Sequence, residues 1–327
     1  MKKLLLIDTY NFLHRAYHAL PPTFRDQNGE PTNAVYGVTS MIISVLEQLK
    51  PDYAVAALDG EKPTFRVEDF TGYKAHRRPV EDALNSQIPK VMEILDAFGI
   101  KRILIDGYEA DDIIGTLAVK FGGGSGNNIG GKEKKKDATK TAQAEVMIVS
   151  NDKDLWQLVN SHVVIMIPNT TGKVEWLGPK EVEARMGFGP ERVVDYKGLR
   201  GDPSDNIPGV FGVGEKTAKD LIQKYGIVED IYKNIDKITP KSLQDKLANC
   251  AEQAVMSKKL ATIQTDVPLQ IELSECKYTD FNKLRVVEVL KRYNFKSLIR
   301  RLGFEADDGV SKKKKEEVPK NQLGLFL

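Results

Sequence analysis

The sequence predicts an α/β protein with a mostly parallel sheet and flanking helices, followed by a helical region. Two observations predict this architecture. Over residues 1–194, short apolar runs of strand length alternate with segments of helical periodicity, which is typical of a parallel sheet covered by helices on both faces. After about Val194 the pattern becomes mostly helical and continues to about Leu302.

The individual elements follow from the position of each apolar run. Strands are predicted at 4–7, 53–58, 103–105, 145–149 and 163–167, and we interpret the first three as buried. Helices are predicted directly after Asp8, at 39–49 and 83–98, after Gly107, and at 218–225. The helix after Gly107 carries a core-facing stripe formed by Ile113, Ile114, Leu117, Ala118 and Phe121.

The composition describes an ordinary globular protein that is long enough for two domains. The chain has 327 residues, of which 41% are apolar and 29% are charged. Its net charge of +2 is the sum of segregated acidic and basic blocks, including a basic cluster at 74–78 and a lysine run at 312–315. This balance neither excludes nor demands a polyanionic partner.

The sequence gives no sign of a membrane segment. No apolar run approaches the ~18 residues that a membrane span needs, and the N-terminal run stops at Asp8, too early for a signal peptide. The two cysteines, Cys250 and Cys276, lack any Cys/His metal spacing. We therefore expect a reduced cytoplasmic environment, without contact with a membrane.

Nine acidic residues occur where predicted strands end or where the helical region begins. They are Asp8, Asp59, Glu109, Asp111, Asp112, Asp152, Asp154, Asp202 and Asp205, the last two being i,i+3 neighbours if that segment is helical. Ligand sites of open parallel sheets lie outside the carboxyl ends of the strands, so we expect these side chains to converge. Unrelated helix caps are the alternative, but single caps do not explain the repetition.

A cluster of this kind favours hard divalent cations. Unpaired carboxylates in one cleft repel one another, and raised pKa values relieve only part of that repulsion. Mg²⁺ prefers carboxylate and water oxygens, whereas the absence of His and Cys at these positions argues against Zn²⁺. Two such ions roughly 3.5–4 Å apart would clamp the attacking and leaving oxygens of a phosphodiester hydrolysis.

Several motifs in order point to a known family over about residues 1–304. They are Leu6-Ile-Asp8, Gly107-Tyr-Glu-Ala-Asp-Asp112, Asp152-Lys-Asp154, Gly201-Asp-Pro-Ser-Asp-Asn-Ile-Pro-Gly209 and Gly212-Val-Gly-Glu-Lys-Thr-Ala218. Together they resemble the 5′→3′ exonuclease domain of bacterial DNA polymerase I, which belongs to the flap endonuclease family. The resemblance implies a PIN-like nuclease core and a two-metal, structure-specific nuclease that acts on 5′ flaps and ends.

The resemblance also divides the acidic residues between two ions. The first ion's neighbourhood is implied to contain Asp8, Asp59, Glu109, Asp111 and Asp112. The second is implied to contain Asp152, Asp154, Asp202 and Asp205, some of them acting through water. The implied ions are Mg²⁺, with Mn²⁺ as a substitute.

The basic and aromatic segment near 64–85 resembles the family's arch. Lys74 and Arg77 are implied to approach the scissile phosphate, where positive charge assists the transfer. Tyr73 beside these cations suits a single-stranded end. Arg15 matches a basic residue near the 5′ nucleotide. The alternative is that Tyr73 is a core residue and Lys74 is solvated.

The segment from Gly209 to Ala218 resembles the family's helix–hairpin element, which binds duplex DNA. Gly212 and Gly214 permit close backbone approach, and N–H groups at the following helix start, near Thr217, can bind phosphate. Lys216 adds a point charge there. The resemblance further implies K⁺ held by backbone oxygens. A plain turn before a helix is the alternative.

The resemblance predicts that the chain has three parts, and the sequence differs from the family pattern at two places. The parts are a nuclease domain at 1–194, a helical DNA-binding domain at 195–304 and a flexible tail at 305–327. The family usually has Gly where this chain has Thr9, and we expect that side chain to crowd the 5′ end. A flexible Gly- and Lys-rich insertion at 122–143 replaces a short connection. Since no polymerase domain follows, we expect a stand-alone nuclease.

The end of the tail resembles the short peptide with which bacterial replication proteins bind the sliding clamp. Leu323, Leu325 and Phe326 would fill apolar pockets, and Gln322 would orient the peptide. The alternative is an apolar end that folds back onto the protein.

These observations lead to one functional hypothesis and two rivals. We expect a monomeric, nucleoid-associated 5′ flap endonuclease and 5′→3′ exonuclease in primer removal and DNA repair, which acts on DNA with 5′ flaps, nicks or ends and on RNA-primed strands. The rivals are a catalytically inactive DNA-binding relative and an RNase H-like nuclease specialised for RNA primers.

Overall fold

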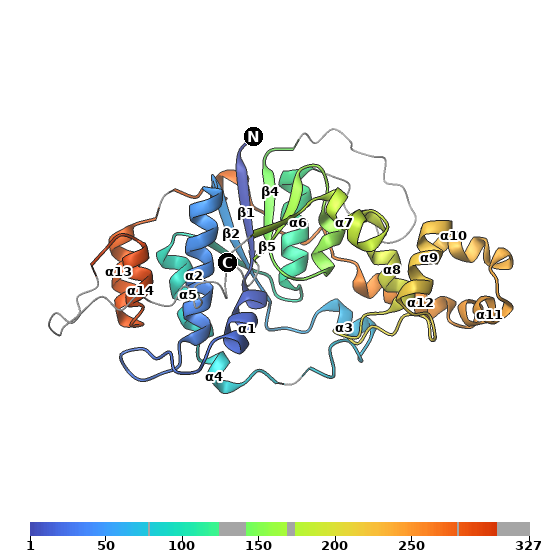
Figure 1. Ribbon diagram of the computed structural model, residues 1–327, viewed down its shortest axis with the longest axis horizontal. Helices are drawn as coiled ribbons and strands as arrows, with labels where there is room; N and C mark the ends of the chain where they lie inside the picture. Colours follow the sequence, from blue (N-terminus) through green and yellow to red (C-terminus); the bar gives the residue numbers. More distant parts are fainter. Residues whose placement is uncertain (78, 124–141, 169–173, 280, 306–327) are drawn as a thin grey trace.

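The computed structural model describes residues 1–77, 79–123, 142–168, 174–279 and 281–305. Most of the predicted insertion at 122–143 lies outside these residues, as do the predicted clamp-binding residues Gln322, Leu323, Leu325 and Phe326. The described residues form a central sheet with helices on both sides, and a helical arm extends to one end of the molecule (Figure 1).

A six-stranded sheet forms the centre, in the order β3-β2-β1-β4-β5-β6. The strands are β1 Lys3–Asp8, β2 Tyr53–Leu58, β3 Lys101–Leu104, β4 Glu145–Val149, β5 Val163–Pro168 and β6 Val174–Leu177. The first five are parallel, and β6 runs antiparallel to β5. Leu6 of β1 pairs with Val55 on one side and Ile148 on the other, so the carboxyl ends of β1, β2 and β4 share one edge.

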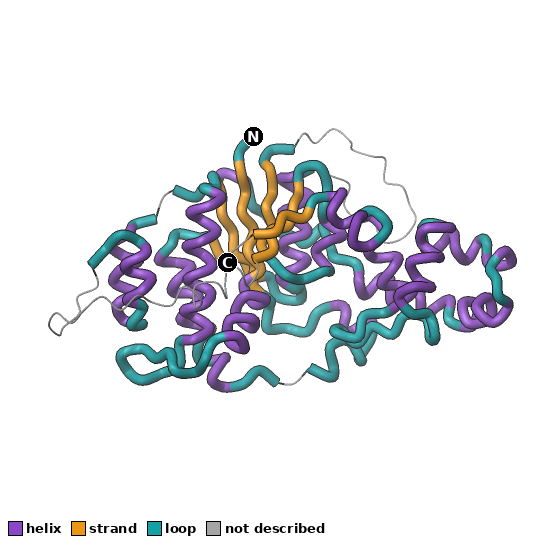
Figure 2. The backbone as a smooth tube through the Cα atoms, in the orientation of Figure 1, coloured by secondary structure: helices purple, strands orange, loops and turns teal. Residues whose placement is uncertain are grey.

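Two helical layers bury both faces of the sheet (Figure 2). Leu4 and Leu6 pack with α6 Ala110–Gly122, while Leu5 and Ile7 pack with α1 Thr9–Ala19, α2 Asn33–Leu49 and α5 Ile88–Ala97. Alternate side chains of a strand point to opposite faces, so a strand covered on both sides needs a continuous apolar sequence.

The other helices connect and extend this core. They are α3 Phe65–Asp69, α4 Asp82–Asn85, α7 Pro179–Met186, α8 Val193–Arg200, α9 Glu215–Tyr225, α10 Val228–Lys233, α11 Lys241–Asn249, α12 Ala251–Ala261, α13 Lys283–Arg292 and α14 Lys296–Arg301. In the part of the chain that the structure describes, every helix is too short or too polar to cross a bilayer.

The helices after Val194 lie at two opposite ends of the molecule. The arm consists of α8 to α12, whereas α13 and α14 pack on the outer side of the helical layer formed by α2 and α5 (Figure 1). Val286, Leu290 and Leu298 belong to the same apolar core as Ile7. The predicted helical segment at 195–304 is therefore divided between the arm and the core, and the domain boundary at 194/195 stays a prediction.

The strand predictions are confirmed for β1, β2, β4 and β5, whereas the third strand differs. It ends at Leu104 instead of residue 105, and it is a partly exposed edge strand instead of a buried one. Ile105 begins the turn in which Gly107 adopts a positive φ of 83°, a conformation that favours glycine. The short, partly exposed β6 was not predicted.

The structure has helices where they were predicted, but several of them begin at other residues and one is interrupted. The helix predicted at 83–98 is interrupted between α4 and α5, where the buried Gln87 accepts hydrogen bonds from Ala34 N (2.8 Å) and Val35 N (3.3 Å) at the start of α2. Capping a neighbouring helix thus takes precedence over local helical periodicity. Helix α2 begins before residue 39 and α9 begins before residue 218, while the stripe on α6 is buried as predicted.

Candidate active site

Six acidic side chains meet in one pocket at the carboxyl edge of the sheet. They are Asp8 at the end of β1, Asp59 after β2, Glu109 and Asp111 at the start of α6, Asp152 after β4, and Asp205 from the loop before α9. The cavity has a volume of about 250 Å³ and is also lined by Lys74, Arg77, Tyr10, Asn11, His14 and Ala110. The predicted convergence is therefore confirmed for these six residues.

Hydrogen bonds fix several pocket carboxylates in place. Ser150 Oγ donates to Asp8 Oδ2 (2.8 Å), and Asn11 N donates to Asp8 Oδ1 (3.2 Å) at the start of α1. Ala110 N donates to Asp59 Oδ1 (2.7 Å), which links the end of β2 to the start of α6. Each carboxylate is thus held by the N-terminal turn of a helix or by a neighbouring loop, and its remaining oxygen positions are available to a ligand.

Four of the pocket carboxyl groups have a raised pKa and so hold protons more tightly than usual. Burial, followed by repulsion from Asp152 and Asp59, raises the pKa of Asp8 to about 7, although Ser150 acts in the opposite direction. Burial, followed by repulsion from Asp152 and Asp8, raises the pKa of Asp111 well above its ordinary value. Burial also raises the pKa of Asp59 and that of Asp152. A cation in this pocket would relieve the repulsion.

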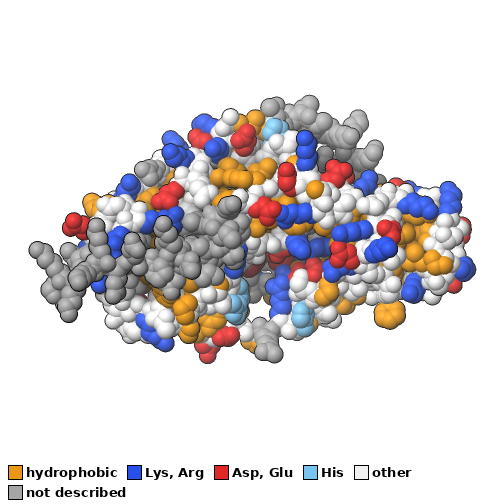
Figure 3. Space-filling view, viewed as in Figure 1, with side chains coloured by type: hydrophobic (Ala, Val, Ile, Leu, Met, Phe, Trp, Pro, Cys, Tyr) orange, Lys and Arg blue, Asp and Glu red, His pale blue; other side chains and the backbone are white. Residues whose placement is uncertain are grey.

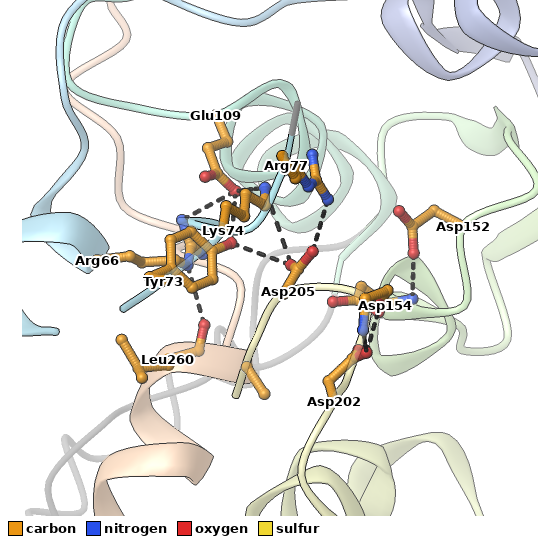
Figure 4. Close-up of polar contacts among 12 residues, drawn as sticks. Arg66, Tyr73, Lys74, Arg77, Glu109, Asp152, Asp154, Asp202, Asp205 and Leu260 are labelled. Carbon is orange, nitrogen blue, oxygen red and sulfur yellow. Dashed lines mark hydrogen bonds and ion pairs between the residues drawn. The ribbon is translucent and has the colours of Figure 1, made fainter. Parts of the chain in front are cut away.

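The residues of the predicted arch close one side of the pocket (Figure 4). Lys74 Nζ lies 2.9 Å from Glu109 Oε2, and Arg77 Nη2 lies 2.6 Å from Asp205 Oδ1. The buried Tyr73 hydroxyl lies within 3.1 Å of both carboxylates. Burial favours the neutral amine of Lys74, but the attraction of Glu109 and Asp205 outweighs it and raises the pKa of Lys74. Lys74 therefore reaches the pocket as an ammonium group, and Arg77 lies beside it against Asp205.

Asp154 and Asp202 lie beside the pocket, and Lys197 of α8 joins them. Its ammonium group contacts Asp154 Oδ1 and lies 2.5 Å from Asp202 Oδ2. Burial acts against the ionised form of Asp202, but Lys197 and Ser204 outweigh it and lower the pKa of Asp202. Asp202 and Asp205 are not helical neighbours, because Asp202 pairs with Ile207 across a tight turn.

Asp112 differs from the expected metal ligand. It is fully buried outside the pocket lining, and Arg66 holds it through bonds of 2.8 Å to Oδ2 and 2.7 Å to Oδ1. Gln264 N donates to Oδ1 (2.8 Å) and Glu109 N donates to Oδ2 (3.2 Å). Arg66 also donates to Leu260 O in the last turn of α12 and to Thr262 O just after it. Asp112 of α6 and Arg66 of α3 thus connect these two helices to residues 260–264, and we call this pair the Arg66–Asp112 joint. In this position Asp112 is not open to an ion.

Thr9 is buried beside the pocket, and its expected crowding of a 5′ end stays a prediction. Its side chain is buried and lies outside the pocket lining, because the first turn of α1 directs it into the protein. Arg15, on the same helix, donates to Pro168 O (2.9 Å) and also lies outside the lining. The structure places Arg15 next to the end of β5, and its proposed contact with a 5′ nucleotide stays a prediction.

The predicted hairpin residues lie at the start of α9. Gly214 is the N-cap and provides no side-chain cap, so the first N–H groups of α9, including that of Thr217, have no side-chain partner at the cap. Gly212 has a positive φ of 77°, which the turn before the helix requires. Lys216 is exposed. Lysine and arginine side chains gather over the region between the sheet and the arm, with acidic side chains among them (Figure 3).

The donor set fits a hard divalent cation by its chemistry. Its acidic members supply only oxygen, and four of them have a raised pKa, which is the environment that such a cation stabilises. Within the described ranges, however, no group of three or more acidic, histidine or cysteine side chains is arranged to hold an ion. Lys74, Arg77 and Lys197 instead engage Glu109, Asp205, Asp154 and Asp202.

Several residues of the site were not predicted. Tyr10 and His14 are four residues apart on α1, and this spacing after Asp8 could have placed them on one helical face. Burial, followed by repulsion from His18 and Arg77, lowers the pKa of His14. Lys197 and Arg66 carried no local signal, because their partners are distant in sequence or separated by a turn.

Comparisons with known proteins agree with this arrangement. The family model described as "5'-3' exonuclease, N-terminal resolvase-like domain" matches residues 3–187, and "5'-3' exonuclease, C-terminal SAM fold" matches residues 188–284. DNA polymerase I of Bacillus subtilis (strain 168) is 39% identical over 97% of this chain and 34% of its own length. DNA polymerase I of Caldicellulosiruptor bescii is 41% identical over 92% of this chain and 33% of its own. The chain thus spans about a third of these relatives.

Solved structures share the fold at low sequence identity. Bacteriophage T5 5′-exonuclease with bound divalent metal ions (zinc) has a TM-score of 0.59 at 22% identity, over 89% of this chain and all of that chain. The catalytic core of Rad2 in complex with DNA substrate has a TM-score of 0.54 at 15% identity, over 92% of each chain. The two family models together cover most of the chain, and it belongs to the 5′-3′ exonuclease family.

Proposed function

We propose that this protein is a divalent-cation-dependent, structure-specific nuclease that hydrolyses phosphodiesters at 5′ flaps, nicks and ends, in primer removal and DNA repair. The observation that carries the proposal is the single pocket in which six acidic side chains face Lys74 and Arg77. The carboxylates can bind metal ions, and the two basic side chains beside them can bind phosphate oxygens. Such a pocket suits a phosphate group with its metal ions. The T5 structures with metal ions and the Rad2 complex with DNA support the same function.

In this proposal the acidic residues of the pocket bind the metal ions, and the basic residues bind the phosphate. Asp8, Asp59, Glu109, Asp111 and Asp152 would hold the ions, for which Mg²⁺ is the preferred species and Mn²⁺ a substitute. When bound, such ions polarise the phosphodiester and make water a better nucleophile. Lys74 and Arg77 bind the phosphate oxygens and leave Glu109 and Asp205 as they do so. Tyr73 positions both carboxylates through its hydroxyl group.

The arm would hold the duplex next to the cleavage site. The uncapped N-terminus of α9 and the exposed Lys216 offer N–H groups and charge to a phosphate backbone. K⁺ bound by backbone oxygens near Gly212 remains part of this proposal. The loop directly before the hairpin is bonded to the arch, because Asp205 O accepts from Lys74 N (2.9 Å) and Gly72 O accepts from Asn206 Nδ2 (2.7 Å). These two bonds link the arch to the chain segment that leads into the duplex-binding hairpin.

A cleavage assay tests the function. Purified protein with Mg²⁺ should release the labelled 5′ arm of a flap duplex, and EDTA or Asp111→Asn should stop the release. Binding without cleavage at any divalent cation would favour the inactive relative. Flaps of identical shape with RNA or DNA 5′ arms address the RNA specialist: similar rates on both exclude it, and cleavage confined to RNA would establish it.

The predicted tail peptide defines a separate proposal. We propose that Gln322, Leu323, Leu325 and Phe326 bind a bacterial sliding clamp. We also propose that the enzyme is a monomer in the cytoplasm, associated with the nucleoid, and that the clamp recruits it to DNA. Deleting residues 322–327 should abolish binding to a purified clamp and leave cleavage of a free flap unchanged. A variant with the same six residues in shuffled order is the control for length and composition. Clamp binding that survives deletion would contradict the proposal.

A further inference from the structure

Phe211 is the most exposed of the large apolar side chains in the described part of the chain. Its side chain is 82% exposed, although both apolar neighbours in the loop, Val210 and Val213, are almost fully buried. The loop connects α8 to α9 and contains the turn of the predicted hairpin. A single exposed apolar side chain is ordinary on a protein surface. A phenyl ring exposed to this degree, however, leaves nearly its whole apolar area available to a partner.

Backbone hydrogen bonds anchor the loop that carries Phe211 to α8 and α12. Val210 N donates to Leu199 O (2.7 Å), Val213 N donates to Val210 O (3.0 Å), and Gly209 N donates to Ser257 Oγ on α12 (3.0 Å). The backbone at Gly209 approaches that of Gly201 so closely that a Cβ there would lie 2.1 Å from Gly201 N. These contacts hold the backbone on both sides of Phe211 in place, with the ring facing solvent.

The surroundings of the ring are suited to a phosphate backbone. The uncapped N-terminus of α9 begins at Gly214, three residues after Phe211. Lys216 and Lys246 are exposed, and the side chain of Lys246 lies against Gly212, where a Cβ would be 3.0 Å from its Nζ. N–H groups without a side-chain cap and two ammonium groups near an apolar ring suit the phosphates and sugars of a duplex backbone.

We propose that Phe211 packs against the sugar edge of the minor groove in the duplex arm of the substrate, between the phosphates bound by α9 and by Lys246. The inference rests on the proposed function, of which it specifies one duplex contact. Among the described residues no aromatic ring stacks on Phe211, whereas single-strand platforms use successive rings. An isolated ring on a projecting turn is instead typical of apolar contacts to a groove.

Binding measurements without divalent cations test this contact. Labelled duplex and the labelled single strand of the same sequence are titrated in EDTA with wild-type protein, Phe211→Ala, Phe211→Trp and Lys216→Ala. Phe211→Ala should weaken duplex binding about tenfold, because an apolar contact of one ring is lost, and leave single-strand binding unchanged. Phe211→Trp should retain duplex binding. Leu284→Ala is the matched control, since Leu284 is 67% exposed on α13 at the other end of the molecule.

The salt dependence separates an apolar contact from a charge contact. Phe211→Ala should lower affinity without changing the slope of log affinity against log salt, whereas Lys216→Ala should reduce that slope by about one. Equal duplex binding by wild-type protein and Phe211→Ala, or a parallel loss of single-strand binding, would overturn the inference. These measurements involve no cleavage, so the two proposals can fail separately. If the protein cleaves no flap but its duplex binding depends on Phe211, the nuclease proposal is refuted and the Phe211 contact stands.

Discussion

The pocket and the Arg66–Asp112 joint treat buried carboxylates in opposite ways. In the pocket, Asp8 and Asp111 have a raised pKa because of burial and because other carboxylates surround them. In the joint, Asp112 is fully buried, and Arg66 neutralises its charge through two hydrogen bonds. Asp111 and Asp112 are consecutive residues of α6 that point in different directions, since successive helical positions are about 100° apart.

The difference shows how to distinguish a structural carboxylate from a catalytic one. When a buried carboxylate is paired with a basic side chain of its own chain, its charge is balanced in the folded protein whether or not a metal ion is bound. A buried carboxylate surrounded by its own kind is satisfied only when an exchangeable cation or a proton arrives. The same acidic motif, Glu109 to Asp112, therefore contributes to a fixed joint and to a reactive pocket.

Asp111→Asn should have the largest effect on activity. It removes a charge that an ion needs, so flap cleavage with Mg²⁺ should fall by at least about a hundredfold. The same change relieves repulsion in the pocket, so the melting temperature in EDTA should not fall. Gel-based cleavage and thermal unfolding measure the two quantities. A large loss of stability together with activity would place Asp111 in the same class as Asp112.

Asp112→Ala should have the largest effect on stability. It leaves the Arg66 guanidinium buried without its partner, which costs about 3–5 kcal/mol of unfolding free energy. Cleavage and DNA binding should then decline together, since the arch base loses its attachment to α6. Denaturant unfolding measures the cost.

The double variant Arg66→Met with Asp112→Leu is the matched control. Because it removes both charges of the joint, it should recover much of the stability that Asp112→Ala loses. Normal stability of Asp112→Ala with selective loss of cleavage would instead return Asp112 to the metal site.

Mg²⁺ should stabilise the protein, and the effect should grow with pH. The folded-state pKa of Asp8 is about 7 and its ordinary value is 3.8, so its contribution to stability is complete below 3.8 and is lost as the pH rises toward 7. A cation competes with that proton for the same oxygens. The increase in melting temperature on adding Mg²⁺ should therefore be larger at about pH 8 than at about pH 5.5, by several degrees. Asp8→Asn is the control, and an increase independent of pH would contradict the pocket assignment.

Thr9→Gly should have the smallest effect. Because Thr9 is buried outside the pocket lining, cleavage of a 5′ flap should change by less than about twofold, while stability falls by about 1–2 kcal/mol from lost packing and a more flexible helix start. Rates on flap and blunt-end substrates are compared with wild type. A marked gain on blunt 5′ ends would instead support the expectation that Thr9 crowds the 5′ end.

The sequence by itself determined the strands β1, β2, β4 and β5, the apolar stripe of α6 and the convergence of six acidic residues. Continuous apolar runs specify strands buried on both faces, and residues at the ends of parallel strands must share one edge. These features depend on local patterns and on a topological rule, so no side-chain coordinates were needed to predict them.

Only the tertiary structure decided which cation each carboxylate meets. Arg66 is 46 residues from Asp112 in sequence, and Lys197 is 43 from Asp154, so no local pattern could pair them. The interruption between α4 and α5 and the return of α13 and α14 to the core have the same origin, because Gln87 and Leu290 find their partners across the fold. Electrostatic and packing contacts depend on distance in space, which the sequence specifies only through the completed fold.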